Sequence, residues 1–387
     1  MAKKLIVFGY GQRGSIYASY AAAYPEQFEL VAIIENDGER IHKARTLYPS
    51  VPVYSDYHEV IKANLSADLV AIATQDNQHK KHAVAFLRAG YDLLLEKPIA
   101  NTEEDCLDIY RASKKYKRNV IVCHVLRYTP FYSAIKHVSY VRGPWRNRGE
   151  SSPMILAKCC HDMDILRYFM NEKCESVNSY GSLFYFNEAH APEGHAQYCS
   201  DCPLQDCIYK AQTLYTAEGK DWCANYFTTR EHTKENITED LRHTQYDRCV
   251  YACDNDVVDH QVTIARFANG KTAAHTMTAF SREVYRDIKI YGTKAELYGI
   301  MEDKLIEVRP FGGAVYRVAV DTSAATLGGH CGGDYFMMQN IFRTLNGEKA
   351  EGITYLDVSI ESHIMSFAAE RSRLHNGQTE YIQNGEN

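Results

Sequence analysis

The chain has 387 residues and a formal net charge of −6. This length predicts two hydrophobic cores rather than one. The acidic balance gives no reason to expect nucleic acid or a membrane surface as a partner, and no stretch approaches the roughly 18 unbroken apolar residues of a membrane span. The residues from Met1 to Lys4 lead directly into a strand-like run without the features of a signal peptide, so we expect a cytoplasmic protein.

Three glycines predict a dinucleotide site near the start of the chain. They form a G-x-G-x-x-G pattern between an apolar run, Lys4–Phe8, and an alanine-rich segment, Ser15–Tyr24. The first indicates a buried strand and the second a helix, which is the context that supports the motif over an ordinary glycine turn. Such a loop brings backbone N–H groups and a helix N-terminus to a pyrophosphate. The cofactor residues predicted here are Gly9, Gly11, Gln12, Arg13 and Gly14.

A second predicted strand, Leu30–Ile34, ends at Glu35. At this spacing a carboxylate accepts hydrogen bonds from the adenosine ribose hydroxyls, and its charge repels a 2′-phosphate. The sequence therefore predicts NAD rather than NADP, although Arg40 could accommodate the extra phosphate of NADP.

Strand-like and helix-like segments alternate over the first 125 residues. Further strands are predicted at Leu69–Ala73, Asp92–Leu95 and Val120–Cys123. Helices are predicted at Gln78–Ala89 and at Thr102–Tyr116, the latter opening on an approximate capping box. This alternation indicates a doubly wound parallel sheet with helices on both faces, so residues 1–125 are expected to form an NAD-binding Rossmann domain.

The pattern changes after residue 125. One apolar helix is predicted at Met154–Met170, and a segment with many cysteines and tyrosines and little periodicity covers about 187–253. Closely spaced strands follow at Val257–Phe267, Thr272–Phe280, Asp287–Tyr291, Ala295–Ile300, Leu305–Val308 and Val315–Val320. Two helices, Asp334–Leu345 and Tyr355–Leu374, come last and could pack back on the first domain. Residues 126–387 are thus predicted to form an α+β domain with an open, mostly antiparallel sheet for substrate binding and oligomerisation.

The strand Asp92–Leu95 runs into Glu96-Lys97-Pro98. The carboxyl ends of strands in a doubly wound sheet face the ligand crevice, so Lys97 is expected beside the nicotinamide. Burial and a cationic ring would lower the pKa of its amine there. Lys97 could then exchange a proton with a substrate hydroxyl during hydride transfer, with Glu96 orienting it. The alternative, on charge alone, is a surface Glu–Lys pair.

Together these motifs resemble the Gfo/Idh/MocA oxidoreductases, the family of glucose–fructose oxidoreductase and inositol dehydrogenase. The resemblance continues through Ala73-Thr74-Gln-Asp-Asn-Gln-His79, Gly90, Arg127-Tyr-Thr-Pro130, His161-Asp-Met-Asp164, Asn255-Asp-Val-Val-Asp-His260, Phe267-Ala-Asn-Gly270 and Tyr291-Gly-Thr293. It implies a Rossmann domain with an open-faced α/β domain. It also implies NAD(P)-dependent oxidation or reduction of a sugar or cyclic polyol, usually in a homo-oligomer such as a dimer or tetramer.

The resemblance also implies roles for individual residues. The further cofactor contacts that it implies are Thr74, Gln75, Asn77, His79, Glu96, Lys97 and Arg127. His161 matches the catalytic histidine of the family by its position before Asp164 and an apolar pair. The aspartate that the family carries four residues earlier is absent, because position 157 is alanine. Lys158 follows it and could take over contacts to the substrate hydroxyl.

Steps of three place Lys158, His161 and Asp164 on one stripe of the predicted helix. Three ionisable groups are costly to bury, so we expect this stripe to face a cleft. Lys97, His161 and Lys158 are the predicted catalytic residues, and Asp164 joins them in contacting substrate. The alternative is a structural histidine.

The connection from Arg127 to His161 is shorter than the family pattern, which usually places a strand there. This leaves the sheet edge and the oligomer built on it open. Its arginines, Arg142, Arg146 and Arg148, could bind an acidic sugar or a phosphate, but a solvated loop is the favoured interpretation.

The 12 cysteines indicate thiols or metal ligands rather than disulfides. Cys199 and Cys202 form a C-x₂-C pair that can hold one metal from a single turn, and Cys207 could be a third ligand. The candidates for a fourth ligand are Cys223, Cys249 and Cys253. A closed, structural zinc site and plain reduced thiols both stay open, whereas the spacing matches no standard iron–sulfur run.

The function predicted from these residues is hydride transfer between nicotinamide and a ring carbinol carbon of a sugar, glycoside or cyclic polyol. Lys97 and His161 would handle the hydroxyl proton. One alternative is redox-neutral glycoside cleavage or epimerisation with a bound, recycled NAD. A second is a non-catalytic, NAD-sensing regulatory protein, against which the presence of Lys97 and His161 argues.

Overall fold

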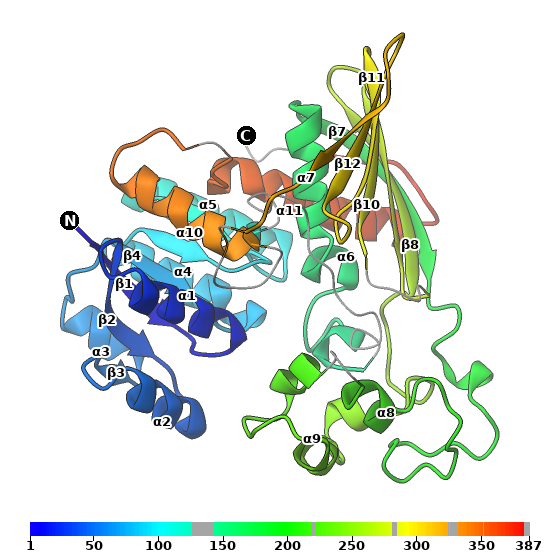
Figure 1. Ribbon diagram of the computed structural model, residues 1–387, viewed down its shortest axis with the longest axis horizontal. Helices are drawn as coiled ribbons and strands as arrows, with labels where there is room; N and C mark the ends of the chain where they lie inside the picture. The colour runs from blue at the N-terminus through cyan, green and yellow to red at the C-terminus, as the bar shows by residue number, and fades with distance from the viewer. Residues whose placement is uncertain are drawn as a thin grey trace.

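The computed structural model describes residues 1–125, 142–217, 221–280, 285–323, 325, 332–350 and 352–382. These residues form one six-stranded parallel sheet and two four-stranded antiparallel sheets. Figure 1 shows the parallel sheet and its helices, coloured blue to cyan, on one side of the molecule and the antiparallel strands on the other. The predicted fold class, a Rossmann domain followed by an α+β domain, is confirmed.

The parallel sheet has the strand order β3-β2-β1-β4-β5-β6. Its strands are β1 (Lys3–Phe8), β2 (Phe28–Ile34), β3 (Val53–Tyr54), β4 (Leu69–Ile72), β5 (Leu93–Leu95) and β6 (Val120–Val122). The order reverses between β1 and β4, and a dinucleotide binds outside the strand ends at such a switch point. Sequence analysis missed β3, because two half-buried residues show no periodicity.

The helices of this domain are α1 (Gln12–Ala23), α2 (Gly38–Leu47), α3 (Tyr57–Lys62), α4 (His79–Arg88) and α5 (Glu103–Tyr116), with a short 3-10 helix at Asp76–Gln78. Helix α5 starts as predicted, because the Thr102 side chain accepts a hydrogen bond of 3.1 Å from the Asp105 amide. Helices α2 and α3 were not predicted, although Asp37 and Asp56 cap them in the same way.

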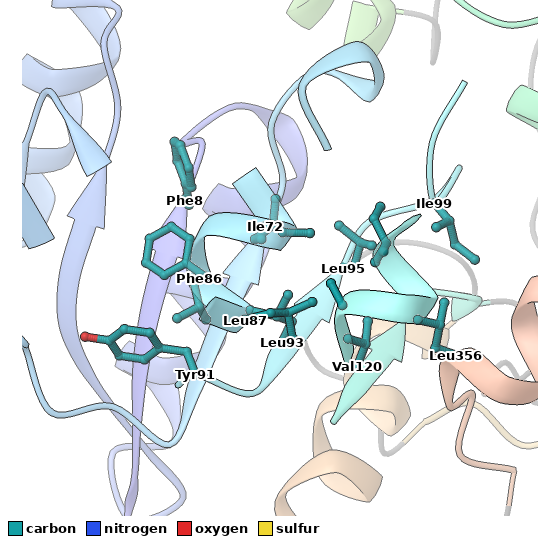
Figure 2. Close-up of a cluster of buried hydrophobic side chains, with 14 of the residues drawn as sticks. Phe8, Ile72, Phe86, Leu87, Tyr91, Leu93, Leu95, Ile99, Val120 and Leu356 are labelled. Carbon is teal, nitrogen blue, oxygen red and sulfur yellow. The ribbon is translucent and has the colours of Figure 1, made fainter. Parts of the chain in front are cut away.

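The central strands of the parallel sheet are apolar on both faces, as burial under helices requires. Leu93, Leu95 and Val120 belong to one buried cluster that also contains Leu356, the first residue of α11 (Leu356–Leu374). Figure 2 shows Leu356 next to Val120 at the edge of this cluster. The last helix of the chain therefore packs on the NAD-binding domain.

The second domain contains both antiparallel sheets. One has the order β14-β7-β8-β9 and the other β10-β11-β12-β13. The strands are β7 (Cys174–Ser182), β8 (His260–Phe267), β9 (Thr272–Thr278), β10 (Asp287–Tyr291), β11 (Ala295–Ile300), β12 (Leu305–Pro310), β13 (Tyr316–Ala319) and β14 (Glu380–Tyr381). Along β8 buried and exposed residues alternate. Its buried face lies in the cluster that contains Met365 of α11, so α11 contributes to both domains.

The helices of the second domain are α6 (Met154–Ala157), α7 (Cys160–Met170), α8 (Ala211–Tyr215), α9 (Lys234–Leu241), α10 (Gly333–Leu345) and α11. Short 3-10 helices lie at Pro144–Arg146, Glu188–His190, Asp221–Tyr226 and Gln245–Asp247. Among the described residues no helix is both long and apolar enough to cross a bilayer.

The prediction of one helix over Met154–Met170 is wrong, because the helix breaks between Ala157 and Cys160. The amides of Lys158 and Cys159 both donate to the Met154 carbonyl, at 3.0 and 3.2 Å. Two amides on one acceptor interrupt the regular ladder, and α7 starts a new one. Lys158 therefore lies in a turn and not on the stripe of His161.

Helix α10 is fastened to the NAD-binding domain by a buried charge network. Arg13 donates from Nη2 to Asp334 at 2.6 Å and from Nε to Glu96 at 2.5 Å. Burial alone would raise the pKa of Glu96, but the charges of Arg13 and Lys97 outweigh it and lower that pKa. Glu96 therefore stays ionised beside Arg13.

We expect Asp334→Ala to lower the free energy of unfolding by about 2–4 kcal/mol, since removing one member of a buried ion pair leaves a charge without its partner. Urea titration measures this change. The control is Glu348→Ala, which removes an exposed ion pair with Arg343 of 3.0 Å in the same part of the chain and should change stability by less than about 1 kcal/mol. Equal stability of the two variants would show that the network does not hold α10.

Candidate active site

The glycine loop between β1 and α1 is shaped for close approach of a phosphate. Gly9 has φ +88°, and a Cβ there would lie 2.6 Å from the Ala73 carbonyl oxygen. A Cβ on Gly14 would lie 1.8 Å from the Gly9 carbonyl oxygen. The first turn of α1 carries no acidic side chain, and Gly11 offers no side-chain cap. The free N–H groups of this turn are therefore available to an anion.

Glu35 is held at the end of β2 by backbone amides. Its carboxylate accepts hydrogen bonds from Tyr10 at 2.7 Å, Asn36 at 2.8 Å and Asp37 at 3.0 Å. A carboxylate has about four acceptor sites, so capacity remains for a ribose hydroxyl. Arg40 lies 3.9 Å from the same carboxylate. A cation therefore lies next to the acid that sets the predicted NAD preference.

The residues after β4 divide into internal and outward-facing groups. His79 is fully buried, and its two ring nitrogens lie 2.8 Å from the Pro98 carbonyl and 3.1 Å from the Thr74 carbonyl. It thus joins the β4 loop to the turn that contains the cis Lys97-Pro98 bond, as a positioning residue rather than a direct contact. Gln75 and Asn77 are exposed, as is Gln12 on α1, so these side chains are free to meet a cofactor. Arg127 lies outside the described residues.

Lys97 reaches from the NAD-binding domain to the second domain. Its Nζ donates a hydrogen bond of 3.0 Å to the carbonyl of Ala157, in the break between α6 and α7. The Glu96 carboxylate makes two contacts: Oε2 accepts from the backbone amide of Lys97 at 3.2 Å, and Oε1 accepts from Arg13. Glu96 therefore fixes the backbone at Lys97 and not its ammonium group.

Lys158 brings a second amine to this place. Burial lowers the pKa of Lys158 well below its ordinary value, and the nearby charge of Lys97 lowers it further, against a smaller opposite effect of Asp76. The Lys158 Nζ lies 5.2 Å from the centre of the Trp145 ring. The charge of Lys97, at the carboxyl end of β5, thus acts on the amine of Lys158 in the turn after Ala157.

His161 and Asp164 are 2% and 1% exposed, so the expectation that they face an open cleft is wrong. Polar partners explain their burial. The Nδ1 of His161 lies 3.4 Å from the Nδ1 of His124, and the Nε2 of His124 lies 3.9 Å from the Asp164 carboxylate. The buried groups therefore form the series Asp164–His124–His161 behind the Lys158 turn.

Sequence reasoning missed two of the histidines in this region. His124 directly follows the strand that was predicted to end at Cys123, and its place at the carboxyl edge of the sheet was a usable signal. His363 lies within α11 and gave no such signal. Its Nε2 accepts from the Ile99 amide at 3.0 Å, and burial lowers its pKa to about 3, so it is neutral.

The interpretation of the arginines before α6 as a solvated loop is wrong for Arg142 and Arg146, whereas Arg148 is exposed. Arg142 and Arg146 are 0% and 4% exposed. Arg146 binds Glu150 and Asp254, each at 2.8 Å, and Arg148 binds Asp256 at 3.2 Å. These aspartates lie more than 100 residues further along the chain, which is why local sequence could not reveal the pairing.

All cysteines of the described part are free, as predicted. Among the described residues the ligand atoms that lie within 4.8 Å of one another belong to Cys159, Asp162 and His275. Arg286 donates to Asp162 at 2.6 Å, so a cation already balances that carboxylate. The predicted ligands Cys199, Cys202 and Cys207 are not in that group. They line one small cavity elsewhere in the second domain.

A Rossmann domain with this glycine loop and acidic residue defines a dinucleotide-binding protein. The chain belongs to the Gfo/Idh/MocA family of oxidoreductases. Residues 3–124 match the model of its NAD-binding Rossmann fold, and residues 119–373 match that of its C-terminal alpha/beta domain. The predicted family and the predicted enzyme class, an oxidoreductase, are thereby confirmed.

Among related proteins, YteT of Bacillus subtilis is 22% identical over 367 residues, which cover 82% of this chain and 83% of that protein. Inositol 2-dehydrogenase of Klebsiella pneumoniae is 29% identical over 194 residues, which cover 46% of this chain and 57% of that protein. Less than two thirds of that dehydrogenase is therefore matched.

Solved structures confirm the fold. Levoglucosan dehydrogenase in complex with NADH and levoglucosan has a TM-score of 0.69 at 18% identity, with 99% of this chain and 100% of that chain covered. The WlbA dehydrogenase of Bordetella pertussis, in complex with NADH and UDP-GlcNAcA, has a TM-score of 0.66 at 15% identity, with 99% and 100% covered.

We expect NAD to bind at least about tenfold more tightly than NADP, equivalent to about 1.4 kcal/mol, because Glu35 repels a 2′-phosphate. Glu35→Ser should narrow this difference, since Arg40 is then free to meet the phosphate. Titration of both cofactors measures the dissociation constants. Glu59→Ser, on the exposed face of α3, removes the same charge and is the control. Equal affinities in the unmodified protein would contradict the role of Glu35.

Proposed function

We propose that the chain is an NAD-dependent dehydrogenase that transfers a hydride between nicotinamide and a ring carbinol carbon of a sugar, glycoside or cyclic polyol. The observation that carries this proposal is the hydrogen bond from Lys97, at the carboxyl end of β5, to the Ala157 carbonyl directly before Lys158, because a doubly wound sheet presents its ligand at this edge. The relatives named inositol 2-dehydrogenase and levoglucosan dehydrogenase support a substrate with ring hydroxyls.

NAD, when bound, supplies the hydride acceptor. In the proposed oxidation the Lys158 amine, neutral because its pKa is lowered, takes the hydroxyl proton as the C–H hydrogen leaves with its electron pair and C=O forms. The Lys97 ammonium keeps one N–H on the Ala157 carbonyl and offers another to the developing alkoxide.

His161 is the second proton-handling residue of this proposal. Its ring lies against His124, and the Asp164 carboxylate beyond His124 favours one arrangement of protons on the two rings. Asp164 acts through His124, so we assign it a positioning role.

We also propose a cytoplasmic homo-oligomer, a dimer or a tetramer. Several aromatic and apolar side chains are exposed on the strands of the antiparallel sheets, a feature of surfaces that pair with a second copy. They include Tyr180, Ile264, Tyr291 and Tyr316.

The test is to incubate the protein with NAD and a panel of sugars, uronates, inositols and glycosides, while recording NADH absorbance and product masses. We expect NADH with a ketone product from at least one ring polyol. Lys97→Met should lower turnover by about 10²-fold or more and leave NAD affinity within a few-fold. Lys114→Met, on the exposed side of α5, is the control and should keep full turnover.

Other outcomes of the panel would favour the alternatives. A changed product mass without net NADH would point to redox-neutral cleavage or epimerisation with recycled NAD. Tight NAD binding without reaction of any compound would point to an NAD sensor. Near-normal turnover of Lys97→Met would overturn the role of Lys97.

The lowered pKa of Lys158 predicts a pH dependence. Sugar oxidation needs the neutral amine, so kcat/KM should fall as the pH drops through this pKa. Lys158→Met should lower kcat/KM by about 10- to 100-fold and remove that acidic limb. In Lys97→Met the limb should move to higher pH, because the charge of Lys97 contributes to the lowering. If His161→Ala loses the limb and Lys158→Met keeps it, His161 is the base.

A further inference from the structure

A small cavity in the segment between β7 and β8 is lined by four cysteines. They are Cys199, Cys202, Cys207 and Cys249, and His195, Lys210 and Tyr251 also line it. The cavity measures about 10 Å³, which is the room that one water-sized sphere needs. Four sulfur atoms around a space of this size are the surroundings of a single ion.

The backbone brings these cysteines together from two distant stretches. Tyr198 and Arg248 form an antiparallel bridge. Beside it the Cys199 amide donates to the Asp247 carbonyl at 2.7 Å, and the Cys249 amide donates to the Gln197 carbonyl at 2.8 Å. A tight turn then returns Cys202, whose amide donates to the Cys199 carbonyl at 3.3 Å.

Contacts that do not involve sulfur hold this frame. Asp247 is fully buried and accepts hydrogen bonds from the Ser200 amide at 3.1 Å, Gln212 Nε2 at 2.9 Å and the His243 amide at 3.0 Å. The Lys210 amide donates to the Cys207 carbonyl at 3.0 Å. Among the described residues, no three of these sulfur atoms all lie within 4.8 Å of one another. Rotation of the cysteine side chains must therefore bring the sulfur atoms to the distances of a tetrahedral site.

Arg142 provides an independent observation that an anion belongs here. Its guanidinium is fully buried, and Nη2 lies 3.7 Å from the Cys199 sulfur. Its Nε and Nη1 have no hydrogen-bond partner among the residues that the structure describes. A buried cation without a counter-charge is strongly destabilising. The described residues that line the adjoining cavity include no carboxylate. Those among them that can become anions are the four cysteines and Tyr251.

A tetrathiolate site for a divalent ion resolves this imbalance. Four thiolates and one such ion carry a net charge of −2, and Arg142 and Lys210 together carry +2. The Nη2 of Arg142, 3.7 Å from the Cys199 sulfur, lies next to the anion that such a site forms.

We propose that Cys199, Cys202, Cys207 and Cys249 bind one structural zinc ion, with Arg142 as the buried counter-charge. Tetrahedral sulfur sites take zinc or iron–sulfur clusters, and room for a single ion favours zinc. The Cys253 thiol donates to the Cys249 carbonyl at 3.0 Å. The other candidate is Cys223. Neither of these lines the cavity, so Cys249 is the fourth ligand.

Elemental analysis of the full chain, purified from zinc-supplemented medium without chelator, tests the proposal. We expect close to one zinc per chain, lost in Cys202→Ser and in Cys207→Ser and kept in Cys253→Ser, the matched control. Cobalt(II) in place of zinc should give thiolate-to-metal charge-transfer absorbance. Less than about 0.1 zinc per chain, zinc kept in Cys202→Ser, or iron with inorganic sulfide would overturn the proposal.

Two further measurements do not depend on how the cysteine variants fold. Removal of zinc from the unmodified protein with a chelator should expose residues 187–253 to trypsin and leave NAD binding intact. Arg142→Met should release zinc to a chelator at least about tenfold faster. If no metal binds, replacing a buried guanidinium that pairs with no carboxylate among the described residues by methionine should leave stability unchanged or raise it, and that result would count against the site.

Discussion

The hydrogen bond from Lys97 to the Ala157 carbonyl is the interaction on which the arrangement of the candidate active site depends. In an unbroken helix the amide of His161 would occupy that carbonyl. Because the helix breaks, His161 donates to Lys158 instead, at 3.3 Å, and the Ala157 oxygen is available to the ammonium group. The break therefore couples the two domains and places Lys158 in the turn beside Lys97. An aspartate at position 157, as in the family motif, would offer a carboxylate near the Lys97 ammonium group. This chain instead offers the backbone carbonyl of Ala157, followed by the amine of Lys158.

The sequence predicted what depends on local pattern. The glycine loop, the Thr102 cap and the strands at 287–291 and 295–300 were placed correctly, because turn chemistry, capping and alternation are local signals. Strand β7 was not predicted, since two of its buried residues, Ser176 and Ser179, are polar and interrupt the apolar pattern. The Ser179 hydroxyl donates to the Val262 carbonyl. The break at Lys158 contains neither glycine nor proline. The carboxylates that bind Arg146 and Arg148, and the contacts of His124, are tertiary, and no spacing in one sequence indicates them.

Charged groups with little exposure are paired at several places in the described residues. Arg146 is buried, Arg13 and Asp162 are partly buried, and each of the three has a partner of opposite sign. Two other cations, Lys158 and Arg142, differ in how they respond to burial. Lys158 responds by a lowered pKa and is thus able to lose its proton. Arg142 cannot, because a guanidinium stays protonated in proteins, so the charge it lacks has to come from its surroundings. Buried cations of the two residue types therefore point to different chemistry, a base in one case and an anionic site in the other.

These two places are connected by aromatic rings. The Lys158 amine lies over Trp145, whose ring meets that of Tyr226 at 5.6 Å, and Tyr226 stacks on Tyr246 at 5.6 Å. Tyr246 belongs to the same buried cluster as Cys199. The cysteine-rich segment, which Figure 1 shows in green around α8 and α9, thus packs through Tyr226 against the Trp145 ring that contacts the Lys158 amine. Since burial is the largest cause of the lowered pKa of Lys158, the order of this segment and the strength of the proposed base are physically linked. A segment outside the NAD-binding domain can in this way set proton chemistry at the carboxyl end of β5.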